Sequence, residues 1–253
     1  MPNSTEKTML ILRCVSDGKG NPVSLEKIAT ETGINKSTAS HIVSKLTEGG
    51  YLQKISHTLG YTIGAELHLL TRYGRYGEEI IRECHPILEY LSRKSGHTAV
   101  FSILSGSRKY IIDRVSPEGI YTDESASIIS DDIYRTVTGR VLLAHIPRDQ
   151  AMSIYGTLPK PDSTSWQEAT SLDGYLRALS EIKGLPFYSI KSGHNIYFWH
   201  SFACPIYKGK KFIGAIGLAV RTTNDENCAE DEERYADLMI KCKRELERRL
   251  NFT

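Results

Sequence analysis

Hydrophobic residues recur at helical spacing in two short segments within residues 24–52, and a glycine separates the two. The first segment has Leu25 and Ile28 on one side, and Ser24 before it can cap the helix by accepting a first-turn N–H. Gly33 suits the left-handed conformation that ends such a helix. The second segment places four apolar residues on one side: Ala39, Ile42, Val43 and Leu46. The pattern predicts a helix-turn-helix.

The outward face of the second helix is short, polar and basic. It offers hydrogen-bond donors and carries no carboxylate before Glu48. A helix of this kind can enter a DNA major groove without repelling the phosphates, and its donors can reach base edges. The candidate DNA-contacting residues on this face are Lys36, Ser37, Thr38, Ser40, His41, Ser44 and Lys45.

Two β-prone runs follow, at 51–56 and 61–63, and predict a hairpin that turns the module into a winged helix-turn-helix. The connection between the runs includes Leu59, which is not an ideal turn residue. Lys54 and His57 of this wing are expected to contact the DNA backbone. The alternative is that the helices and the hairpin form only a structural module, because helix-turn-helix patterns also arise by chance.

Beyond the wing, helical and strand periods alternate. Helical spacing of apolar residues predicts helices over 5–16, 64–77, 78–95, 136–146, 151–156, 166–183 and 229–251. Runs rich in β-formers predict strands over 97–106, 107–116, 185–193, 195–207 and 211–220. Pro86 predicts a kink or a fresh start inside its helix. After residue 78 this order predicts an α+β fold with an antiparallel sheet and helices to one side of it.

Four motifs together resemble the IclR family of transcriptional regulators, and they follow the family's order and usual spacing. The resemblance extends over residues 5–250. The motifs are SLEKIATETGINKSTASHIVSKLTEGGYL at 24–52, YTIGAELHLL at 61–70, TGRVLLAHI at 138–146 and FACPIYKGKKFIGAIGLAV at 202–220.

The resemblance implies three parts of the chain. Residues 1–63 form the winged helix-turn-helix domain, and 64–77 form a linker helix that joins the domains and helps to pair two protomers. Residues 78–253 form an effector-binding domain built on a GAF-like or PAS-like antiparallel sheet. For 64–77, the alternative is a helix that packs only on its own wing domain.

Composition is that of a soluble globular protein, with 253 residues of which 40% are hydrophobic and 25% charged. No apolar run has the length of a membrane span and no signal-peptide pattern is visible, so we expect a cytoplasmic protein with no membrane partner. The five cysteines are scattered and form no CxxC pair, which indicates neither a disulfide framework nor a zinc ribbon. They are Cys14, Cys84, Cys204, Cys228 and Cys242.

Charge becomes informative when the chain is divided. The whole chain carries +2, whereas residues 1–77 contain nine Lys or Arg against six Asp or Glu, a net charge of +3. A mildly basic head on a neutral body fits a DNA-binding module joined to another domain. Because +3 is weak for DNA binding, a dimer that reads two half-sites is expected.

The start of the helix predicted at 136–146 is a candidate ligand site. Unpaired first-turn N–H groups and the positive end of the helix dipole favour an anion, and Gly139 would let a ligand approach the backbone. By the resemblance, Val137, Thr138 and Gly139 face a small carboxylate effector. The alternative is that Thr138 only caps the helix and Gly139 only packs.

Strand residues would form the opposite wall of that site. By the resemblance, Lys191, Ser201, Gly217 and Ala219 occupy positions that often hold polar ligand contacts, but the last two have no side-chain donor. Lys191 would pair with an anionic ligand only if it turns inward; the alternative is a solvated surface lysine. Apolar walls, which suit an effector with an apolar or aromatic part, are expected from Tyr197, Phe198 and Trp199.

Neither a metal site nor catalysis is indicated. His194, His200 and Cys204 could ligate a metal, but zinc sites normally show more tightly spaced ligands, so a buried histidine and a core cysteine are favoured. Cys204 with His200 is also the tempting nucleophile and base, yet both lie in a motif that a sheet explains. No phosphate-binding, dinucleotide-binding or hydrolase motif is present. We therefore expect no enzyme activity, no catalytic residue and no cofactor.

The sequence thus predicts a ligand-responsive, sequence-specific regulator that controls genes for catabolism of a small organic acid or sugar acid. Its expected partners are a double-stranded DNA operator, a small-molecule effector and itself, as a dimer or a dimer of dimers. Two alternatives stay open at this point. In one, the C-terminal domain serves oligomerisation alone; in the other, it senses a nucleotide or cofactor on a GAF-like scaffold.

Overall fold

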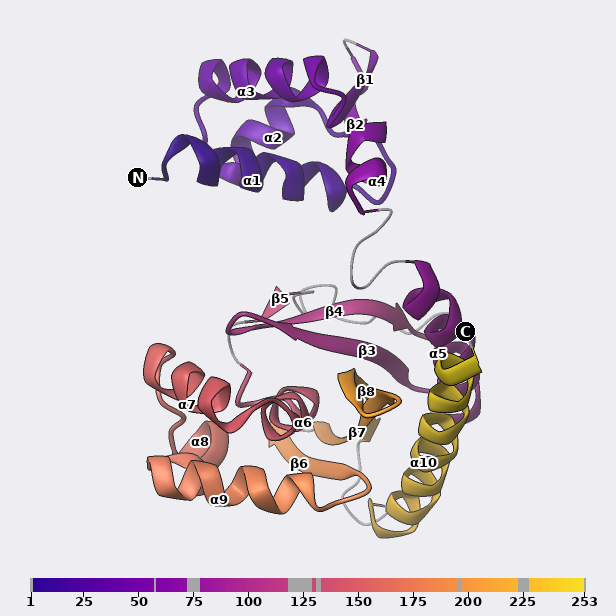
Figure 1. Cartoon of the computed structure of the whole chain (residues 1–253). Coiled ribbons are helices and arrows are strands. Elements are labelled where there is room, and N and C mark those ends of the chain that lie inside the picture. The colour runs from indigo at the N-terminus through magenta and orange to yellow at the C-terminus, as the bar shows by residue number, and fades with distance from the viewer. Residues whose placement is uncertain are drawn as a thin grey trace. The chain divides into compact units, whose positions relative to one another are not determined.

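The computed structural model describes residues 2–56, 58–71, 78–117, 129–130, 133–194, 197–222 and 228–252. The chain forms two compact units, Met1–Glu78 and Glu79–Thr253 (Figure 1). The finer division into 1–63, 64–77 and 78–253 stays a prediction. No helix in the described ranges is long and apolar enough to span a bilayer.

The first unit opens with three helices whose ends lie where the sequence provides caps. The side chains of Ser24 and Asn35 accept hydrogen bonds from the N–H groups of Lys27 (3.2 Å) and Thr38 (2.8 Å). The second helix ends at Gly33, whose φ is 66°. The helices are α1 (Ser4–Ser16), α2 (Leu25–Thr32) and α3 (Lys36–Glu48). The predicted helix-turn-helix is confirmed.

A two-stranded antiparallel hairpin, β1 (Leu52–Ser56) and β2 (Gly60–Ile63), follows α3 and confirms the wing. Backbone hydrogen bonds of 2.8 and 2.9 Å between Val23 and Tyr61 tie the hairpin to the segment before α2. The helices and the hairpin share one hydrophobic core. Its buried residues are Ile11, Cys14, Val15, Val23, Ile28, Ile34, Ala39, Ile42, Val43, Leu46 and Leu52.

The helix after the wing, α4, spans Ala65–Thr71, while residues 72–77 of the predicted linker helix lie outside the described residues. Leu69 and Leu70 on α4 are 54% and 59% exposed, and α4 has no buried residue. The helix therefore does not bury an apolar face on its own unit.

The second unit is built on an antiparallel sheet with the strand order β5-β4-β3-β8-β7-β6 (Figure 1). The hairpins predicted from the sequence are present. The strands are β3 (Thr98–Ser105), β4 (Arg108–Val115), β5 (Ile129–Ser130), β6 (Tyr188–His194), β7 (Tyr197–Lys208) and β8 (Lys211–Thr222). This α+β architecture with an antiparallel sheet confirms the predicted fold class.

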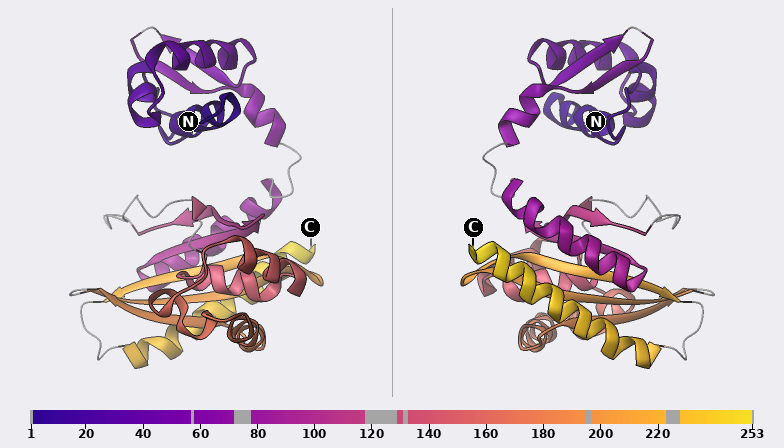
Figure 2. Two further views of the ribbon diagram at one scale, coloured as in Figure 1. Left: turned by 90° about the vertical axis from the view of Figure 1, so that its left-hand side faces the viewer. Right: turned by 90° about the vertical axis from the view of Figure 1, so that its right-hand side faces the viewer.

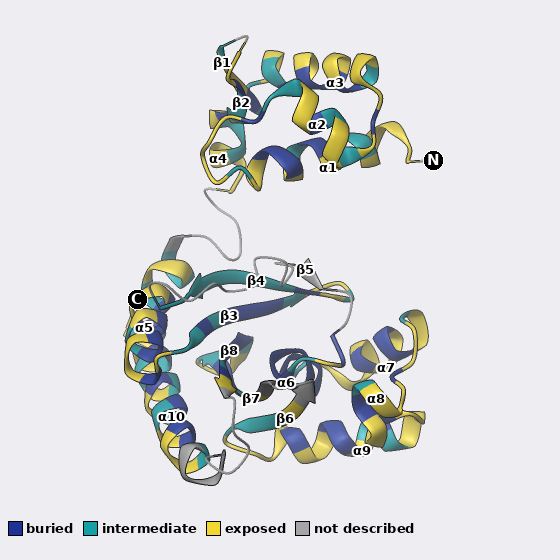
Figure 3. Ribbon diagram, turned by 180° about the vertical axis from the view of Figure 1, so that it is seen from behind, coloured by how far each residue is buried: buried dark blue, intermediate teal, exposed yellow. Residues whose placement is uncertain are grey.

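Helices cover both faces of this sheet, so the expectation of helices to one side was wrong (Figures 1 and 2). One face is covered by five elements: α6 (Val137–His145), α7 (Arg148–Thr157), α8 (Ser163–Trp166), the 3-10 turn η1 (Gln167–Ala169) and α9 (Leu172–Lys183). The opposite face carries α5 (Glu78–Ser95) and α10 (Cys228–Phe252). Figure 3 shows buried positions all around α6 and along the sheet-facing side of α10.

The central strand β7 explains why helices must pack on both faces of the sheet. Phe202, Ala203 and Cys204 are consecutive and each is 0% exposed, although successive strand residues point to opposite faces. Ala203 belongs to the core formed with α6 and α9, whereas Cys204 lies near Cys242 and Lys243 of α10. A strand apolar on both sides must be buried on both sides.

Two helix predictions needed correction. α5 runs without interruption through Pro86, so there is no fresh start there. The segment predicted as one helix over 166–183 is instead α8, η1 and α9, because Ser171 caps a new helix by accepting the N–H of Gly174 (3.1 Å). Side-chain capping of this kind competes with helix continuation.

Aspartate substitutions on β7 test the double cover. Either Ala203→Asp or Cys204→Asp would bury an unpaired carboxylate, so each should lower the free energy of unfolding by about 3 kcal/mol or more. Lys210→Asp, on the exposed β7–β8 turn, is the control and should change it by less than about 0.5 kcal/mol. Urea denaturation followed by circular dichroism measures all three. A variant at 203 or 204 as stable as the control would mean that one face of the sheet is open.

Candidate nucleic-acid interface and effector site

The polar face of α3 is displayed to solvent. Of the seven residues predicted to contact DNA on this helix, six are exposed: Lys36, Ser37, Ser40, His41, Ser44 and Lys45. Thr38 is half-buried, and its N–H is held by the Asn35 cap (2.8 Å). The apolar residues of α3 face the core, so the helix presents a continuous hydrogen-bonding surface (Figures 1 and 3).

A carboxylate closes the C-terminal end of that surface. Glu48 accepts a hydrogen bond from Lys45 Nζ at 2.8 Å and lies 3.4 Å from Ser44 Oγ. The bond from Lys45 holds the pKa of Glu48 below its usual value, so the carboxylate stays ionised at neutral pH. Glu48 thus offsets the charge of a lysine predicted to contact phosphate, an effect that the i, i+3 spacing of the two residues signals.

The two predicted wing contacts, Lys54 and His57, stay predictions. Lys54 is exposed, and its Nζ lies 6.0 Å from the centroid of the Tyr61 ring. His57, the second predicted phosphate contact, lies outside the described residues. The end of the β1–β2 hairpin and α3 lie on the same side of the unit, away from α1 (Figures 1 and 2).

In the second unit, Thr136 and not Thr138 caps α6. Its Oγ1 accepts the N–H of Gly139 at 3.1 Å and a hydrogen bond from Lys109 Nζ at 3.2 Å. Lys109 is only 5% exposed, so a buried cation sits beside the first turn of α6. The positive end of the helix dipole lies beside this ammonium.

The first turn of α6 packs directly on the sheet. Thr138 is 4% exposed, and a Cβ added at Gly217 on β8 would lie 2.5 Å from Thr138 Cγ2. A Cβ at Gly139 would overlap the carbonyl oxygen of Ile133. Gly139 therefore packs closely against its own chain on the side where a Cβ would lie, and its predicted role in effector binding stays a prediction.

Strand register brings several of the other predicted residues onto the same face as Thr138. Ser201 pairs with Ala219, and Ala203 pairs with Gly217, which contacts α6. Trp199 shares this face by strand alternation and is 39% exposed. Tyr197 opens β7 opposite His194, but the side chains of Tyr197 and Phe198 lie outside the described residues.

Lys191 does not join this group, which corrects the predicted site. It pairs across β6 and β7 with His200, and neighbouring cross-strand residues point to the same face. His200 faces α10, and Lys191 Nζ forms an ion pair with Glu232 of α10 at 3.2 Å. Lys191 therefore lies on the opposite face of the sheet from Thr138.

Two of the candidate metal ligands, His200 and Cys204, which are also the candidate base and nucleophile, are core residues. His200 is 1% exposed and its ring packs 4.2 Å from that of Phe202, centroid to centroid. Burial raises the pKa of the Cys204 thiol to about 12, so it is protonated and poorly nucleophilic at neutral pH. The side chain of His194 lies outside the described residues. Within the described ranges, His, Cys, Asp and Glu form no cluster suited to a metal ion.

Arg140 is a buried charge to which the sequence reasoning assigned no role. It is 8% exposed, and its guanidinium stacks 4.5 Å from the Trp166 ring centroid. It donates hydrogen bonds to Tyr134 O (2.8 Å), Tyr188 Oη (3.0 Å) and Ser165 O (2.6 Å). The signal in the sequence was an arginine inside an otherwise apolar helix. Arg140 joins α6 to α8 and to β6.

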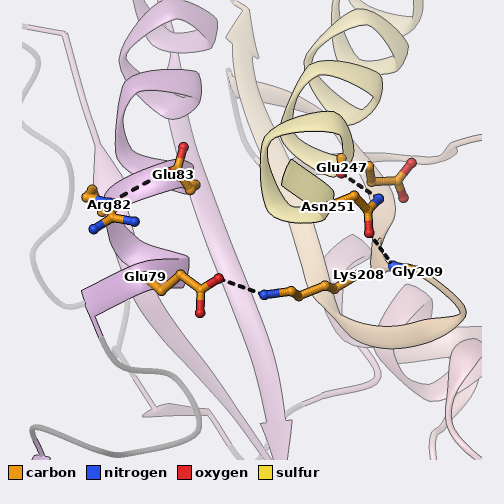
Figure 4. Close-up of polar contacts among 7 residues, drawn as sticks. All are labelled: Glu79, Arg82, Glu83, Lys208, Gly209, Glu247 and Asn251. Atoms are coloured by element: carbon orange, nitrogen blue, oxygen red, sulfur yellow. Dashed lines mark hydrogen bonds and ion pairs between the residues drawn. The ribbon is translucent and has the colours of Figure 1, made fainter. Parts of the chain in front are cut away.

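A polar cluster holds the start of α5 beside the β7–β8 turn (Figure 4). Glu79 Oε1 lies 2.6 Å from Lys208 Nζ at the end of β7. The turn is also tied to the end of α10, because the N–H of Gly209 donates to Asn251 Oδ1 at 2.7 Å. The first turn of the second unit is thus connected to the hairpin that carries Ser201 and Gly217.

A winged helix-turn-helix followed by an antiparallel-sheet domain is the architecture of two-domain, DNA-binding sensor proteins. Two family models match the chain: the IclR helix-turn-helix domain over residues 4–56, and the bacterial transcriptional regulator IclR C-terminal domain over 76–248. The second match alone covers more than half of the chain. The chain belongs to the IclR family.

Curated relatives match the chain over part of their length. An HTH-type transcriptional regulator of Mycobacterium tuberculosis, Rv1719, is 30% identical over 128 residues, 51% of this chain and 49% of that protein. The transcriptional repressor IclR of Escherichia coli is 20% identical over 153 residues, 60% of this chain and 56% of that protein. The chain spans about half the length of the curated relatives that it matches.

Solved structures share the fold across both units. An IclR homologue from Microbacterium hydrocarbonoxydans in complex with 4-hydroxybenzoate has a TM-score of 0.73 and 14% identity, with 99% of this chain and 100% of that chain covered. The IclR protein of Thermotoga maritima has a TM-score of 0.65 and 19% identity, with 98% and 99% covered.

Replacement of Arg140 tests its joining role. Arg140→Ala removes three donors from buried or half-buried oxygens, so the free energy of unfolding should fall by about 2–4 kcal/mol. Arg135→Ala, an exposed arginine of the same turn, is the control and should cost less than about 0.5 kcal/mol. Chemical denaturation compares the two. Equal stability of both variants would show that Arg140 does not hold these elements together.

Proposed function

We propose that the chain is a ligand-responsive, sequence-specific regulator of transcription that binds double-stranded DNA through α3 and the wing. The observation that carries the proposal is the exposed face of α3, which is polar and basic up to Glu48, in a winged helix-turn-helix of the IclR family. The names of the relatives, a transcriptional regulator and a repressor, support it.

The proposed contacts divide by chemistry. Lys36 and Lys45 neutralise phosphates, while the hydroxyl and imidazole groups of α3 read base edges in the major groove. Lys54 and His57 of the wing contact the backbone. The base-reading residues we propose are Ser37, Thr38, Ser40, His41 and Ser44.

Pairing of two protomers is part of the proposal. One module with a net charge of +3 over residues 1–77 has little electrostatic affinity for DNA. The exposed Leu69 and Leu70 of α4 offer apolar surface for a second copy of the 64–77 segment. Two modules held with their recognition helices about 34–36 Å apart would read half-sites one helical turn apart.

The proposed effector is a small carboxylate that binds between the first turn of α6 and strands β7 and β8. Lys109 and the α6 dipole supply positive potential, and Thr138 with Ser201 supplies hydroxyls on the facing surfaces. Val137, Gly139, Gly217, Ala219, Tyr197 and Trp199 complete the proposed wall. The complex of a family member with 4-hydroxybenzoate, an aromatic carboxylate, supports this class of ligand.

The proposed mechanism is a shift in population between two arrangements of the second unit. A ligand entering beside Thr138 must separate α6 from Gly217, because the two are in contact. The displaced β7–β8 hairpin carries Lys208, which holds Glu79 at the start of α5. The change therefore reaches the segment that connects to the DNA-binding unit and alters the spacing of two recognition helices.

Charge substitutions on α3 test the DNA interface. With a duplex selected from a random pool by the wild-type protein, Lys36→Ala should weaken binding and reduce the salt dependence by about one phosphate contact. Glu48→Gln should act in the opposite direction, because Lys45 is released from its carboxylate partner. Fluorescence anisotropy over a range of salt concentrations measures both effects.

Lys7→Ala is the matched control, because it removes one half-buried lysine from α1, a helix to which we assign no DNA contact. It should leave the salt dependence unchanged. If Lys36→Ala behaves as Lys7→Ala does, α3 is not the DNA-contacting helix.

A pair of serine variants tests the effector site. Ser201 faces α6, whereas Ser189 faces α10 and donates to Glu232 at 3.3 Å. An acid such as 4-hydroxybenzoate that binds beside α6 should raise Tm by several degrees in wild-type protein and in Ser189→Ala, and by clearly less in Ser201→Ala. A thermal-shift panel of aromatic and aliphatic acids measures this. No stabilising acid would favour a domain that only oligomerises.

A further inference from the structure

The tip of the wing is built to display a leucine. Ser56 Oγ accepts the backbone N–H of Leu59 at 2.9 Å and lies 3.1 Å from Thr58 Oγ1. The strand that follows is tied to the body of the unit by the two backbone hydrogen bonds between Tyr61 and Val23. These bonds hold the described backbone on both sides of Leu59.

That side chain is apolar and open to solvent. Leu59 is 57% exposed, and Ile55, beside the irregularity between Lys54 and Ser56, is 44% exposed. A hairpin tip is normally made of Gly, Asn, Asp or Ser, so a leucine there is not explained by turn formation. Its exposed apolar area costs hydration free energy that a partner surface would recover.

The charges of the same surface are few. Lys45 is held by Glu48, and Lys54, the described cation of the wing, lies near the Tyr61 ring. Phosphate neutralisation therefore contributes less here than on a strongly basic DNA-binding surface. Recognition that is weak in charge must draw on base edges and on the deformability of the DNA.

We propose that Leu59 is an apolar wedge that enters the DNA minor groove next to the α3 site and kinks the duplex. We assign DNA as the partner of Leu59 because the hairpin end and α3, the proposed DNA-contacting helix, lie on the same side of the unit (Figures 1 and 2). Leucine is among the side chains that proteins insert between base steps. This inference rests on the proposed DNA-binding function. It assigns the wing a specificity role, because flexible pyrimidine–purine steps deform most easily.

The test measures bending separately from binding. A duplex selected from a random pool by the wild-type protein is labelled at both ends, and energy transfer between the labels reports the bend. Wild type should bend the duplex by about 20° or more. Leu59→Ala should lose at least half of that bend and bind about tenfold more weakly, with an unchanged salt dependence.

Two variants make the result specific. Leu59→Met keeps a long apolar side chain and should retain the bend, and Ile55→Ala removes an exposed aliphatic side chain from the same hairpin and should retain it too. Both positions, 55 and 59, are exposed, so Tm should not change in any of the three variants.

The outcomes separate the two proposals. Failure to select any duplex overturns the DNA-binding function and this inference together. A selected duplex that stays straight, or one that Leu59→Ala bends as wild type does, overturns the wedge alone and leaves DNA binding standing. Equal loss of bending in Ile55→Ala and Leu59→Ala also overturns it, because the bend would then depend on the apolar surface of the wing in general and not on insertion of Leu59.

Discussion

The second unit depends on a buried guanidinium. Among the described residues, Arg140 donates to three neutral oxygens, from the turn before α6, from α8 and from β6. A buried charge is tolerated only while its donors are satisfied, so these elements cannot separate from α6 independently. Because Thr136 caps the same helix and binds Lys109 of β4, the first turn of α6 is fixed from both sides.

Because the first turn of α6 is fixed, a ligand that binds beside it can displace only the elements that contact that turn. The contact between Thr138 and Gly217 joins α6 to β8, and the β7–β8 turn joins the sheet to α5 through Lys208 and Glu79 (Figure 4). The side chains of that ion pair are 39% and 45% exposed, so it contributes at most about 1 kcal/mol. The ion pair matters because it links the start of α5 to the β7–β8 hairpin, so that a displacement of the hairpin also moves α5.

Local chemistry could be predicted from the sequence, whereas pairing across the fold could not. Ser24 caps α2 through a bond to a near neighbour and Gly33 ends that helix in the left-handed conformation, and both predictions were confirmed. Lys191 was misplaced because its face depends on register: Ile190, one residue earlier, is the partner of Ser201. Period two fixes which residues share a face, but not which helix covers that face. For the same reason the sequence could not predict that α5 and α10 pack on the second face of the sheet, or which residues Arg140 contacts.

The electrostatics of α3 favour discrimination over affinity. Lys45, which we propose contacts phosphate, lies near the helix C-terminus, where Glu48 holds it at 2.8 Å and remains ionised. In the proposed complex a duplex must displace that carboxylate before it gains the contact, so nonspecific binding is penalised at every site, while a matching sequence recovers the loss through base contacts. By this argument a single weakly charged module discriminates well but binds poorly. The proposed pairing of two modules would restore affinity without adding nonspecific charge, which would make their spacing the quantity that an effector controls.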